Sequence, residues 1–171
     1  VPEPAYANYM AFAISAGAKI RTIATTIEEG FSLPKVEKFE ELINERTKAI
    51  LICNPNNPTA RILDSKTLNT WIKTAKSTTF FIIDEAYAEF VTDKNFQSCV
   101  ELVKKGQKNV IVARTFSKLF AMAALRLGYG VATKETAALI DGFQSIDNTN
   151  LAGAVAGLSL IHISEPTRQA E

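Results

Sequence analysis

A lysine that follows an apolar run is the residue in this chain best suited to covalent chemistry. Residues 110–112 form a β-rich run, Lys118 follows through a polar turn, and Arg126 lies eight residues beyond the lysine. A lysine that is removed from water and placed beside other cations can act as an amine nucleophile and form a Schiff base with an aldehyde. We therefore expect an aldehyde ligand, with Arg114 and Arg126 as the nearby positive charges.

The residues around Lys118 also suit a phosphate group. Thr115 and Ser117 carry hydroxyls and Arg126 carries a forked guanidinium, a combination that suits a phosphate monoester. The plainer interpretation is a surface lysine at the end of a strand, since lysines are mostly exposed. Taken alone, the segment leaves both interpretations open.

Polar side chains follow two other apolar runs. Asn57 lies in the turn N-P-N-N-P-T after residues 47–53, and Asp84 and Tyr87 follow residues 78–83. In open α/β sheets, ligands bind beyond the carboxyl ends of the strands, so these side chains could reach a common ligand. Each also has a structural alternative, because asparagine and proline build turns and aspartate caps helices.

An aromatic residue stands near the start of the chain. Tyr6 begins a helical pattern after a proline turn, and Tyr9 follows one helical turn later. A flat ring at such a position can stack on a planar ligand, whereas packing in the core is the alternative for both tyrosines.

These segments together resemble the fold type I pyridoxal-phosphate aminotransferases of class I/II, and most closely their histidinol-phosphate aminotransferase-like branch. The likeness covers about residues 3–158, and it rests on E-P-A-Y at residues 3–6, N-P-N-N-P-T at 54–59, I-I-D-E-A-Y at 82–87, T-F-S-K at 115–118 and L-R-L-G-Y at 125–129. The family has glycine where this chain has Ala60, Ala121 and Ala124. A positive φ at Ala60 would strain that turn.

The resemblance implies a site for pyridoxal 5'-phosphate. Lys118 would hold the cofactor covalently and then carry the substrate proton as general base and acid. The other implied contacts are Asp84 to the pyridine nitrogen, Asn57 and Tyr87 to the phenolic oxygen, Tyr6 on the face of the ring, and Thr115, Ser117 and Arg126 to the phosphate.

The implied function is transfer of an amino group between an amino acid, or histidinol phosphate, and a 2-oxo acid, by a homodimer. A decarboxylase or lyase on the same scaffold, a cofactor-binding regulatory module and a scaffold without cofactor are the alternatives. The family's glycine-rich phosphate turn would precede Val1, and its substrate-carboxylate arginine would follow Glu171. We therefore expect a fragment that shows little or no turnover alone.

The elements that must position these residues alternate along the chain. Uniformly apolar runs predict strands buried on both faces, and the helical patterns between them predict an α/β fold with a mostly parallel sheet and helices on both faces, as part of the aminotransferase large domain. The predicted strands lie near residues 19–24, 48–53, 78–83, 109–113 and 129–132. Residues 1–160 are assigned to a partial large domain. Residues 161–171 are expected to be a non-native or disordered tail, because Ser164 to Gln169 resembles the peptide read from a sequencing adapter.

Composition narrows the function classes. The 171 residues are 47% hydrophobic and 22% charged, with a formal net charge of +1. This near-neutral balance does not support nucleic acid or a membrane as the partner. Cys53 and Cys99 stand in apolar or helical settings and are expected to be buried thiols rather than a disulfide or a metal pair. A reducing, cytoplasmic location is the default expectation.

Overall fold

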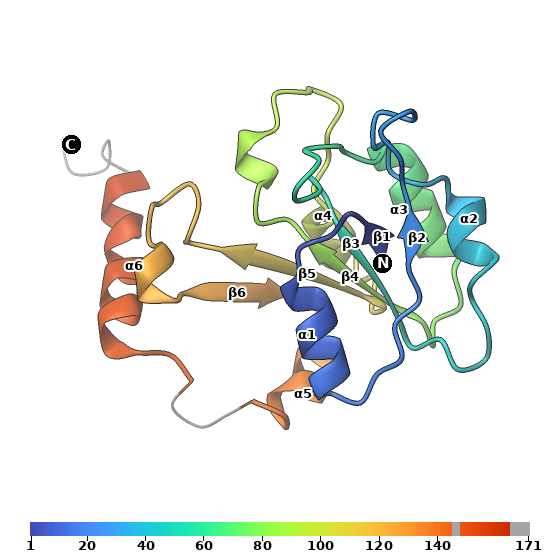
Figure 1. Ribbon diagram of the computed structural model, residues 1–171. Helices are drawn as coiled ribbons and strands as arrows, with labels where there is room; N and C mark the ends of the chain where they lie inside the picture. The colour runs from blue at the N-terminus through green and yellow to red at the C-terminus, as the bar shows by residue number, and fades with distance from the viewer. Residues whose placement is uncertain (145–147, 165–171) are drawn as a thin grey trace.

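Strands and helices alternate along the chain (Figure 1). The structure is a computed structural model that describes residues 1–144 and 148–164, with side chains described up to residue 160. The elements are β1 Pro2–Glu3, α1 Asn8–Ser15, β2 Ile23–Ala24, α2 Val36–Glu40, β3 Ala49–Cys53, α3 Ser65–Thr74, β4 Phe80–Asp84, the 3-10 turn η1 Ala88–Phe90, α4 Val100–Lys104, β5 Val110–Thr115, the 3-10 turn η2 Ala123–Leu125, β6 Gly128–Val131, α5 Lys134–Asp141 and α6 Leu151–Ser164.

A four-stranded sheet in the order β3-β4-β5-β6 lies at the centre of the fold. The strands β3, β4 and β5 are parallel, and β6 is antiparallel to β5. The α/β fold with a mostly parallel sheet is confirmed, and four of the predicted strands lie in this sheet with small shifts at their ends. Because β3, β4 and β5 run the same way, the loops that follow them emerge from the same edge of the sheet.

One face of the sheet carries the core. Alternate side chains of β3, β4 and β5 point to this face and pack with residues of α2, α3 and α4, and burying such apolar surface is the main favourable contribution to folding. The buried cluster consists of Phe39, Ile50, Ile52, Leu68, Trp71, Ile72, Phe81, Ile83, Cys99, Leu102, Val110 and Val112.

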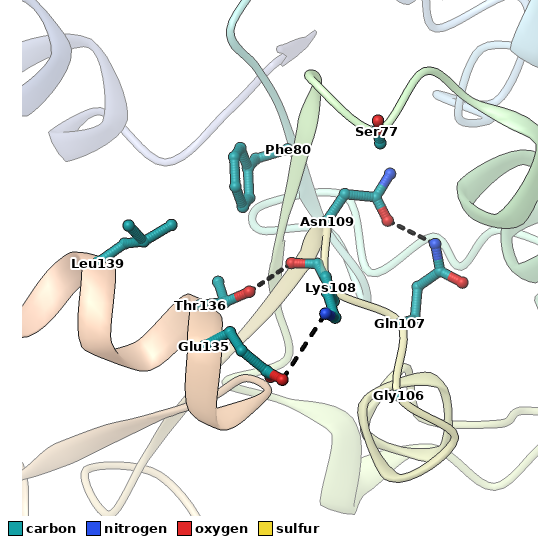
Figure 2. A pocket seen from close by; sticks show the side chains of 9 residues that line it. All are labelled: Ser77, Phe80, Gly106, Gln107, Lys108, Asn109, Glu135, Thr136 and Leu139. Carbon is teal, nitrogen blue, oxygen red and sulfur yellow. Dashed lines mark hydrogen bonds and ion pairs between the residues drawn. The ribbon is translucent and has the colours of Figure 1, made fainter.

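The opposite face is only partly covered. Leu51, Ile82 and Ile111 point to it and are half-buried. Helix α5 approaches this face, since its Leu139 and Phe80 of β4 line the same hollow (Figure 2). Helix α1 reaches the same face through a contact with the end of β4. Helices on both faces are therefore confirmed, although the strands were predicted to be buried on both faces.

The strand predicted at residues 19–24 is wrong in its extent and its place. Only Ile23–Ala24 is extended, and it pairs in parallel with Pro2–Glu3 in a separate two-stranded sheet. Lys19, Arg21 and Thr22 are exposed, and Ile23 is the residue of this segment that packs on the core. With so little apolar surface, the segment cannot form a fully buried strand.

Local sequence signals define several helix ends. The Asp64 side chain accepts a hydrogen bond of 2.7 Å from the Thr67 amide and caps α3. Thr133 caps α5 by accepting from the Thr136 amide. Gly106, with φ of +85°, follows α4.

The last helix is α6, which lies beside η2 (Figure 1). The Asn150 side chain, just before α6, donates to the Leu125 carbonyl at 2.7 Å and links the two. Within the described residues, no helix is both long enough and apolar enough to cross a membrane. Residues 165–171 lie outside the described part of the chain, so the assignment of residues 161–171 to a tail stays a prediction.

Candidate active site

Strand alternation brings several predicted site residues to one face at the carboxyl edge of the sheet. The strand register pairs Cys53 with Asp84 and Asp84 with Ala113. Paired residues point to the same face, and so does Thr115, two residues beyond Ala113. The Asp84 carboxylate and the Thr115 hydroxyl therefore leave neighbouring strands on the partly covered face.

The Asp84 carboxylate is held at both oxygens. Its Oδ2 accepts a hydrogen bond of 2.5 Å from the Tyr9 hydroxyl, and its Oδ1 accepts one of 2.9 Å from the Ala86 amide. The first distance is typical of a hydroxyl that donates to a carboxylate. Asp84 does not cap a helix, because the next helical element, η1, begins at Ala88.

Burial controls the ionisation of the groups beside Asp84. Burial raises the pKa of Tyr9 far above its usual range, with further contributions from Cys53 and from Asp84. Burial also raises the pKa of the Cys53 thiol, which lies against the Tyr9 hydroxyl. Both groups therefore stay protonated near neutral pH, so Tyr9 is a permanent donor to the carboxylate.

Tyr6 lies beside this arrangement. Its ring meets the Tyr9 ring edge-on, with centroids 5.5 Å apart and an interplanar angle of 83°. The Tyr6 side chain is 44% exposed, so the alternative of burial in the core does not hold. An exposed ring next to the Tyr9–Asp84 contact is available to a ligand.

The N-P-N-N-P-T turn leaves one asparagine side chain free. Asn54 accepts from the Leu63 amide at 2.9 Å, and Asn56 donates to the Pro4 carbonyl at 3.1 Å. These two side chains therefore hold the turn itself. Among the described residues, the side-chain amide of Asn57 forms no hydrogen bond, which leaves it able to bind a ligand.

Asn57 and Tyr87 line a common hollow of about 500 Å³ between the asparagine turn and the loop after β4. The rest of its lining is mainly apolar and comes from Pro55, Asn56, Pro58, Ala60, Ile62, Phe90, Val91, Thr92 and Asp93. Neither Asp84 nor Lys118 belongs to this lining. The hollow therefore lies next to the Asp84 contacts rather than around them.

Lys118 lies over the Tyr87 ring. Its Nζ is 4.9 Å from the ring centroid, a cation–π distance. The contact brings the predicted amine to the loop that follows Asp84. The Lys118 side chain is exposed, however, so the predicted removal of this amine from water is wrong for the described chain. The turn beyond β5 places the lysine outside the sheet instead of inside the core.

The predicted phosphate ligands are only partly assembled. The Ser117 amide donates to Thr115 Oγ1 at 3.1 Å, so these two residues share one tight turn. Thr115 also donates to the Leu127 carbonyl at 3.4 Å, next to Arg126 in the chain. The Arg126 guanidinium itself is exposed and donates to the Ala123 carbonyl at 2.7 Å.

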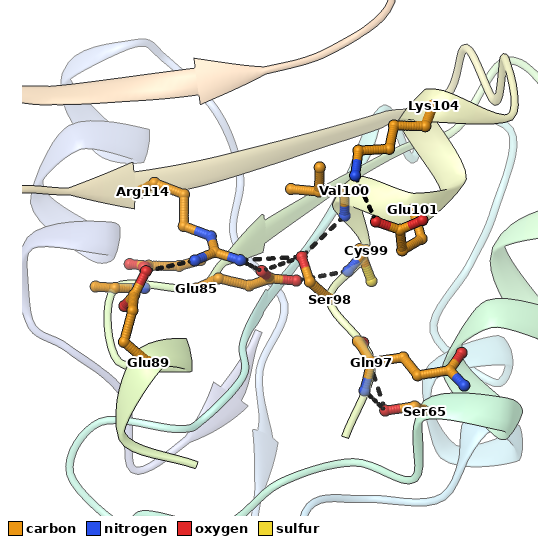
Figure 3. A network of polar contacts seen from close by, with 12 residues as sticks. Ser65, Glu85, Glu89, Gln97, Ser98, Cys99, Val100, Glu101, Lys104 and Arg114 are labelled. Atoms are coloured by element: carbon orange, nitrogen blue, oxygen red, sulfur yellow. Dashed lines mark hydrogen bonds and ion pairs between the residues drawn. The ribbon is translucent and has the colours of Figure 1, made fainter. Parts of the chain in front are cut away.

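Arg114 does not supply positive charge to Lys118, and that prediction is wrong. Because Arg114 precedes Thr115, its side chain points to the opposite face of the sheet. There its guanidinium contacts Glu85 at 2.6 Å and Glu89 at 2.5 Å, and it donates to Ser98 at 3.0 Å (Figure 3). Two carboxylates therefore balance the charge of Arg114.

Glu85 is the centre of this polar network. It is completely buried, and its carboxylate also accepts from the Cys99 amide and the Ser98 hydroxyl, each at 2.7 Å (Figure 3). The network ties the end of β4 to β5 and to the start of α4. It thereby fixes the backbone that carries Asp84.

A second hollow, of about 370 Å³, lies at the other edge of the sheet (Figure 2). Its described lining comes from the amino-terminal ends of β4 and β5 and from α5, and consists of Ser77, Phe80, Gly106, Gln107, Lys108, Asn109, Glu135, Thr136 and Leu139. Its lining contains none of the predicted cofactor ligands, so the candidate site is at the carboxyl edge.

Two residues of the site region were missed from the sequence. Tyr9 was not among the implied cofactor contacts, although it lies only three residues beyond Tyr6, in the first turn of α1. Glu85 follows Asp84 directly, and strand alternation alone would have sent it to the opposite face. What the sequence lacked was the knowledge of which face each helix covers.

Comparison with known proteins identifies the family. Residues 1–166 match the family described as aminotransferase class I and II. A histidinol-phosphate aminotransferase of Brevibacillus brevis is 32% identical over 160 residues, which is 94% of this chain and 43% of that protein. The chain spans less than half the length of the curated relatives that it matches.

Solved structures show the same fold. The crystal structure of a histidinol-phosphate aminotransferase from Erwinia carotovora atroseptica superposes with a TM-score of 0.83 at 34% identity, covering 94% of this chain and 46% of that one. An aspartate aminotransferase from Thermotoga maritima gives 0.81 at 26% identity, covering 94% and 43%. On the strength of the family match over residues 1–166, this chain belongs to the class I and II aminotransferases, which depend on pyridoxal phosphate.

Proposed function

We propose that this chain forms the cofactor-holding part of an aminotransferase that transfers an amino group between an amino acid, or histidinol phosphate, and a 2-oxo acid. The observation that carries the proposal is the set of contacts at the carboxyl edge of the sheet. The Lys118 amine lies 4.9 Å from the centroid of the Tyr87 ring, and Tyr87 lies three residues beyond Asp84, the last residue of β4. This contact between the segments that follow β4 and β5 supports a shared site for the amine, the phenol and the carboxylate.

The donor set fits pyridoxal phosphate. The cofactor presents an aldehyde, a phenolic oxygen, a pyridine nitrogen and a phosphate, and each needs a different partner. Lys118 would bind the aldehyde carbon, Asp84 would accept the proton of the pyridine nitrogen, and Asn57 and Tyr87 would face the phenolic oxygen. The free side-chain amide of Asn57 supports that assignment. The exposed ring of Tyr6 would cover the pyridine.

The phosphate would bind at the turn after β5. Thr115 and Ser117 already share a turn there, and their hydroxyls would donate to phosphate oxygens. Arg126 would have to exchange its hydrogen bond to the Ala123 carbonyl for one to the phosphate. Both bonds come from the cationic guanidinium, but a phosphate would add the attraction between opposite charges, which favours that exchange.

The bound cofactor would supply an electron sink for the bond broken at the substrate α-carbon. The remaining work falls to residues of the chain. Lys118, once released from the cofactor, would take the proton from the α-carbon on its Nζ and return it as general acid. Asp84 would face the pyridine nitrogen, with its carboxylate held in place by the Tyr9 hydroxyl and the Ala86 amide, which both donate to it.

Assembly as a homodimer belongs to the same proposal. Among the described side chains of α6, those of Leu151, Val155 and Leu158 are 80%, 59% and 66% exposed. Exposed apolar surface of this kind is typical of an interface. Sedimentation of the protein at several concentrations measures the mass directly, and a monomer at all concentrations would remove this part of the proposal.

Transamination is tested by following the fate of the cofactor. The chain is loaded with pyridoxal phosphate, excess ligand is removed, and L-glutamate, L-aspartate, L-phenylalanine or L-histidinol phosphate is added. We expect slow formation of pyridoxamine phosphate, and none with Lys118→Ala. Release of carbon dioxide with regeneration of pyridoxal phosphate would indicate the decarboxylase alternative instead.

A further inference from the structure

Helix α1 is joined to the sheet mainly through one side chain. No residue of α1 is buried, and Phe12 and Ile14 are 69% and 68% exposed. Among the described residues, the side-chain hydrogen bonds from α1 to the sheet all involve the Tyr9 hydroxyl, which donates to Asp84, 75 positions away, and lies against the Cys53 thiol. Tyr9 therefore decides where α1 lies relative to β4.

The same side chain contacts two predicted cofactor ligands. Its hydroxyl donates to Asp84 at 2.5 Å, and its ring meets the Tyr6 ring with centroids 5.5 Å apart. Asp84 is the predicted partner of the pyridine nitrogen, and Tyr6 is the predicted cover of the ring face. The Asp84 carboxylate and the Tyr6 ring must keep a fixed relative position if both are to contact one flat ring.

The chemistry of Tyr9 suits a permanent donor. The hydroxyl lies between the Asp84 carboxylate and the Cys53 thiol, and burial raises its pKa. The Asp84 Oδ1 is occupied by the Ala86 amide at 2.9 Å, so a donor at Oδ2 fixes the plane of the carboxylate. Each carboxylate oxygen has two lone pairs, so Oδ2 can still accept a second proton donor.

We infer that Tyr9 is a positioning residue, which holds the Asp84 carboxylate and the Tyr6 ring in the relative placement that a pyridine ring needs. The inference rests on the proposed function, since it assigns Tyr9 a role toward the same cofactor. Tyr9 acts through Asp84, so its hydroxyl should matter only while the carboxylate is present.

A double-mutant cycle tests this dependence in the full 171-residue chain. Tyr9→Phe removes the hydroxyl and keeps the ring, Asp84→Asn removes the charge, and the double variant combines them. Pyridoxal phosphate is titrated into each, and the dissociation constant and the pH dependence of the bound absorbance are measured. Tyr129→Phe is the matched control, because it removes a hydroxyl from an exposed tyrosine.

We expect Tyr9→Phe to raise the dissociation constant about tenfold, which is the size of a lost hydrogen bond to a charged group. It should also move the midpoint of the absorbance–pH curve. In the Asp84→Asn background, Tyr9→Phe should raise the dissociation constant by less than about twofold. Equal costs in both backgrounds, or an unmoved midpoint, would show that Tyr9 only packs and would overturn the inference.

A second measurement separates failure of the proposed function from failure of the role of Tyr9. If the wild-type chain forms no borohydride-reducible product with pyridoxal phosphate, the cofactor proposal and the role of Tyr9 fall together. If the wild type forms the product but the cycle is additive, the cofactor proposal stands and only the role of Tyr9 falls.

A ligand-free measurement covers the case in which Tyr9→Phe does not fold. Amide hydrogen exchange in Asn8–Ser15 reports how firmly α1 is held. We expect Asp84→Asn alone to speed exchange there about tenfold, because it weakens the same hydrogen bond from the other end. Unchanged exchange in α1 would show that the bond does not hold the helix, which contradicts the inference.

Discussion

Two neighbouring carboxylates at the end of β4 have opposite surroundings. Asp84 points to the partly covered face, where Tyr9 and Ala86 donate to it and a ligand can approach. Glu85 points to the covered face, is completely buried, and bonds to Arg114 at 2.6 Å. Because side chains alternate along an extended chain, Asp84 faces the proposed cofactor site and Glu85 faces the buried polar network.

This division predicts unequal costs for losing the two partners of Arg114. Glu85→Ala should lower the free energy of unfolding by about 3–5 kcal/mol, because it leaves a largely buried guanidinium without its main partner. Glu89 is 28% exposed, so Glu89→Ala should cost only about 1 kcal/mol. Urea denaturation of both variants measures the difference. Similar costs for the two would contradict the central position of Glu85.

At the scale of elements, the turn between β5 and β6 carries strain. Ala121 has a φ of +54° in the turn that follows Lys118, and its amide donates to the Lys118 carbonyl at 3.0 Å. Ala60, in the asparagine turn, has a φ of +56°, so the condition for strain in that turn is met. Residues other than glycine pay a steric cost in this left-handed region.

Replacing the strained alanine should therefore stabilise the chain. Ala121→Gly is expected to raise the free energy of unfolding by about 1 kcal/mol, because glycine adopts a positive φ without steric cost. Ala124→Gly is the matched control in η2, where φ is not positive, and it should lower stability by about 0.5–1 kcal/mol. Thermal unfolding of both compares them. Destabilisation by both would mean that the turn is not strained at Ala121.

The sequence predicted the buried elements better than the exposed ones. The strands β3, β4 and β5 are uniformly apolar, and such runs can only be placed inside a sheet. The segment at residues 19–24 mixes apolar and polar residues. Among these described residues, only Ile23 packs against the core, and the sequence of the segment alone does not reveal this. The assignment of Arg114 failed for a similar reason, since its partners are 25 and 29 residues away.

At the scale of the whole molecule, the burial of the Cys99 thiol makes the stability of the fold depend on pH. Burial raises the pKa of the Cys99 thiol to about 12, with Glu85 as the second cause. The same thiol titrates near its ordinary value of 9.0 in the unfolded chain. Between these values the unfolded chain loses a proton that the folded chain keeps, so stability falls as pH rises.

Cys99→Ala should remove the part of the stability loss at high pH that comes from the thiol. At pH 7 the variant is expected to be less stable than the wild type, because it loses apolar contacts in the core. Above the ordinary thiol pKa, the difference in free energy of unfolding between the wild type and the variant should narrow by about 1 kcal/mol per pH unit. Guanidinium denaturation between pH 7 and 11 measures both curves. Parallel curves over that range would contradict the burial of Cys99 as a neutral thiol.

The central claim is that loops from neighbouring strands meet around one cofactor with Lys118 as its covalent partner. The most direct measurement is reduction of the chain with borohydride in the presence of pyridoxal phosphate, followed by peptide mapping. The account predicts a single modified residue, Lys118, with no modification of the same peptide in Lys118→Ala. Label spread over other lysines, and unchanged in amount by Lys118→Ala, would contradict it.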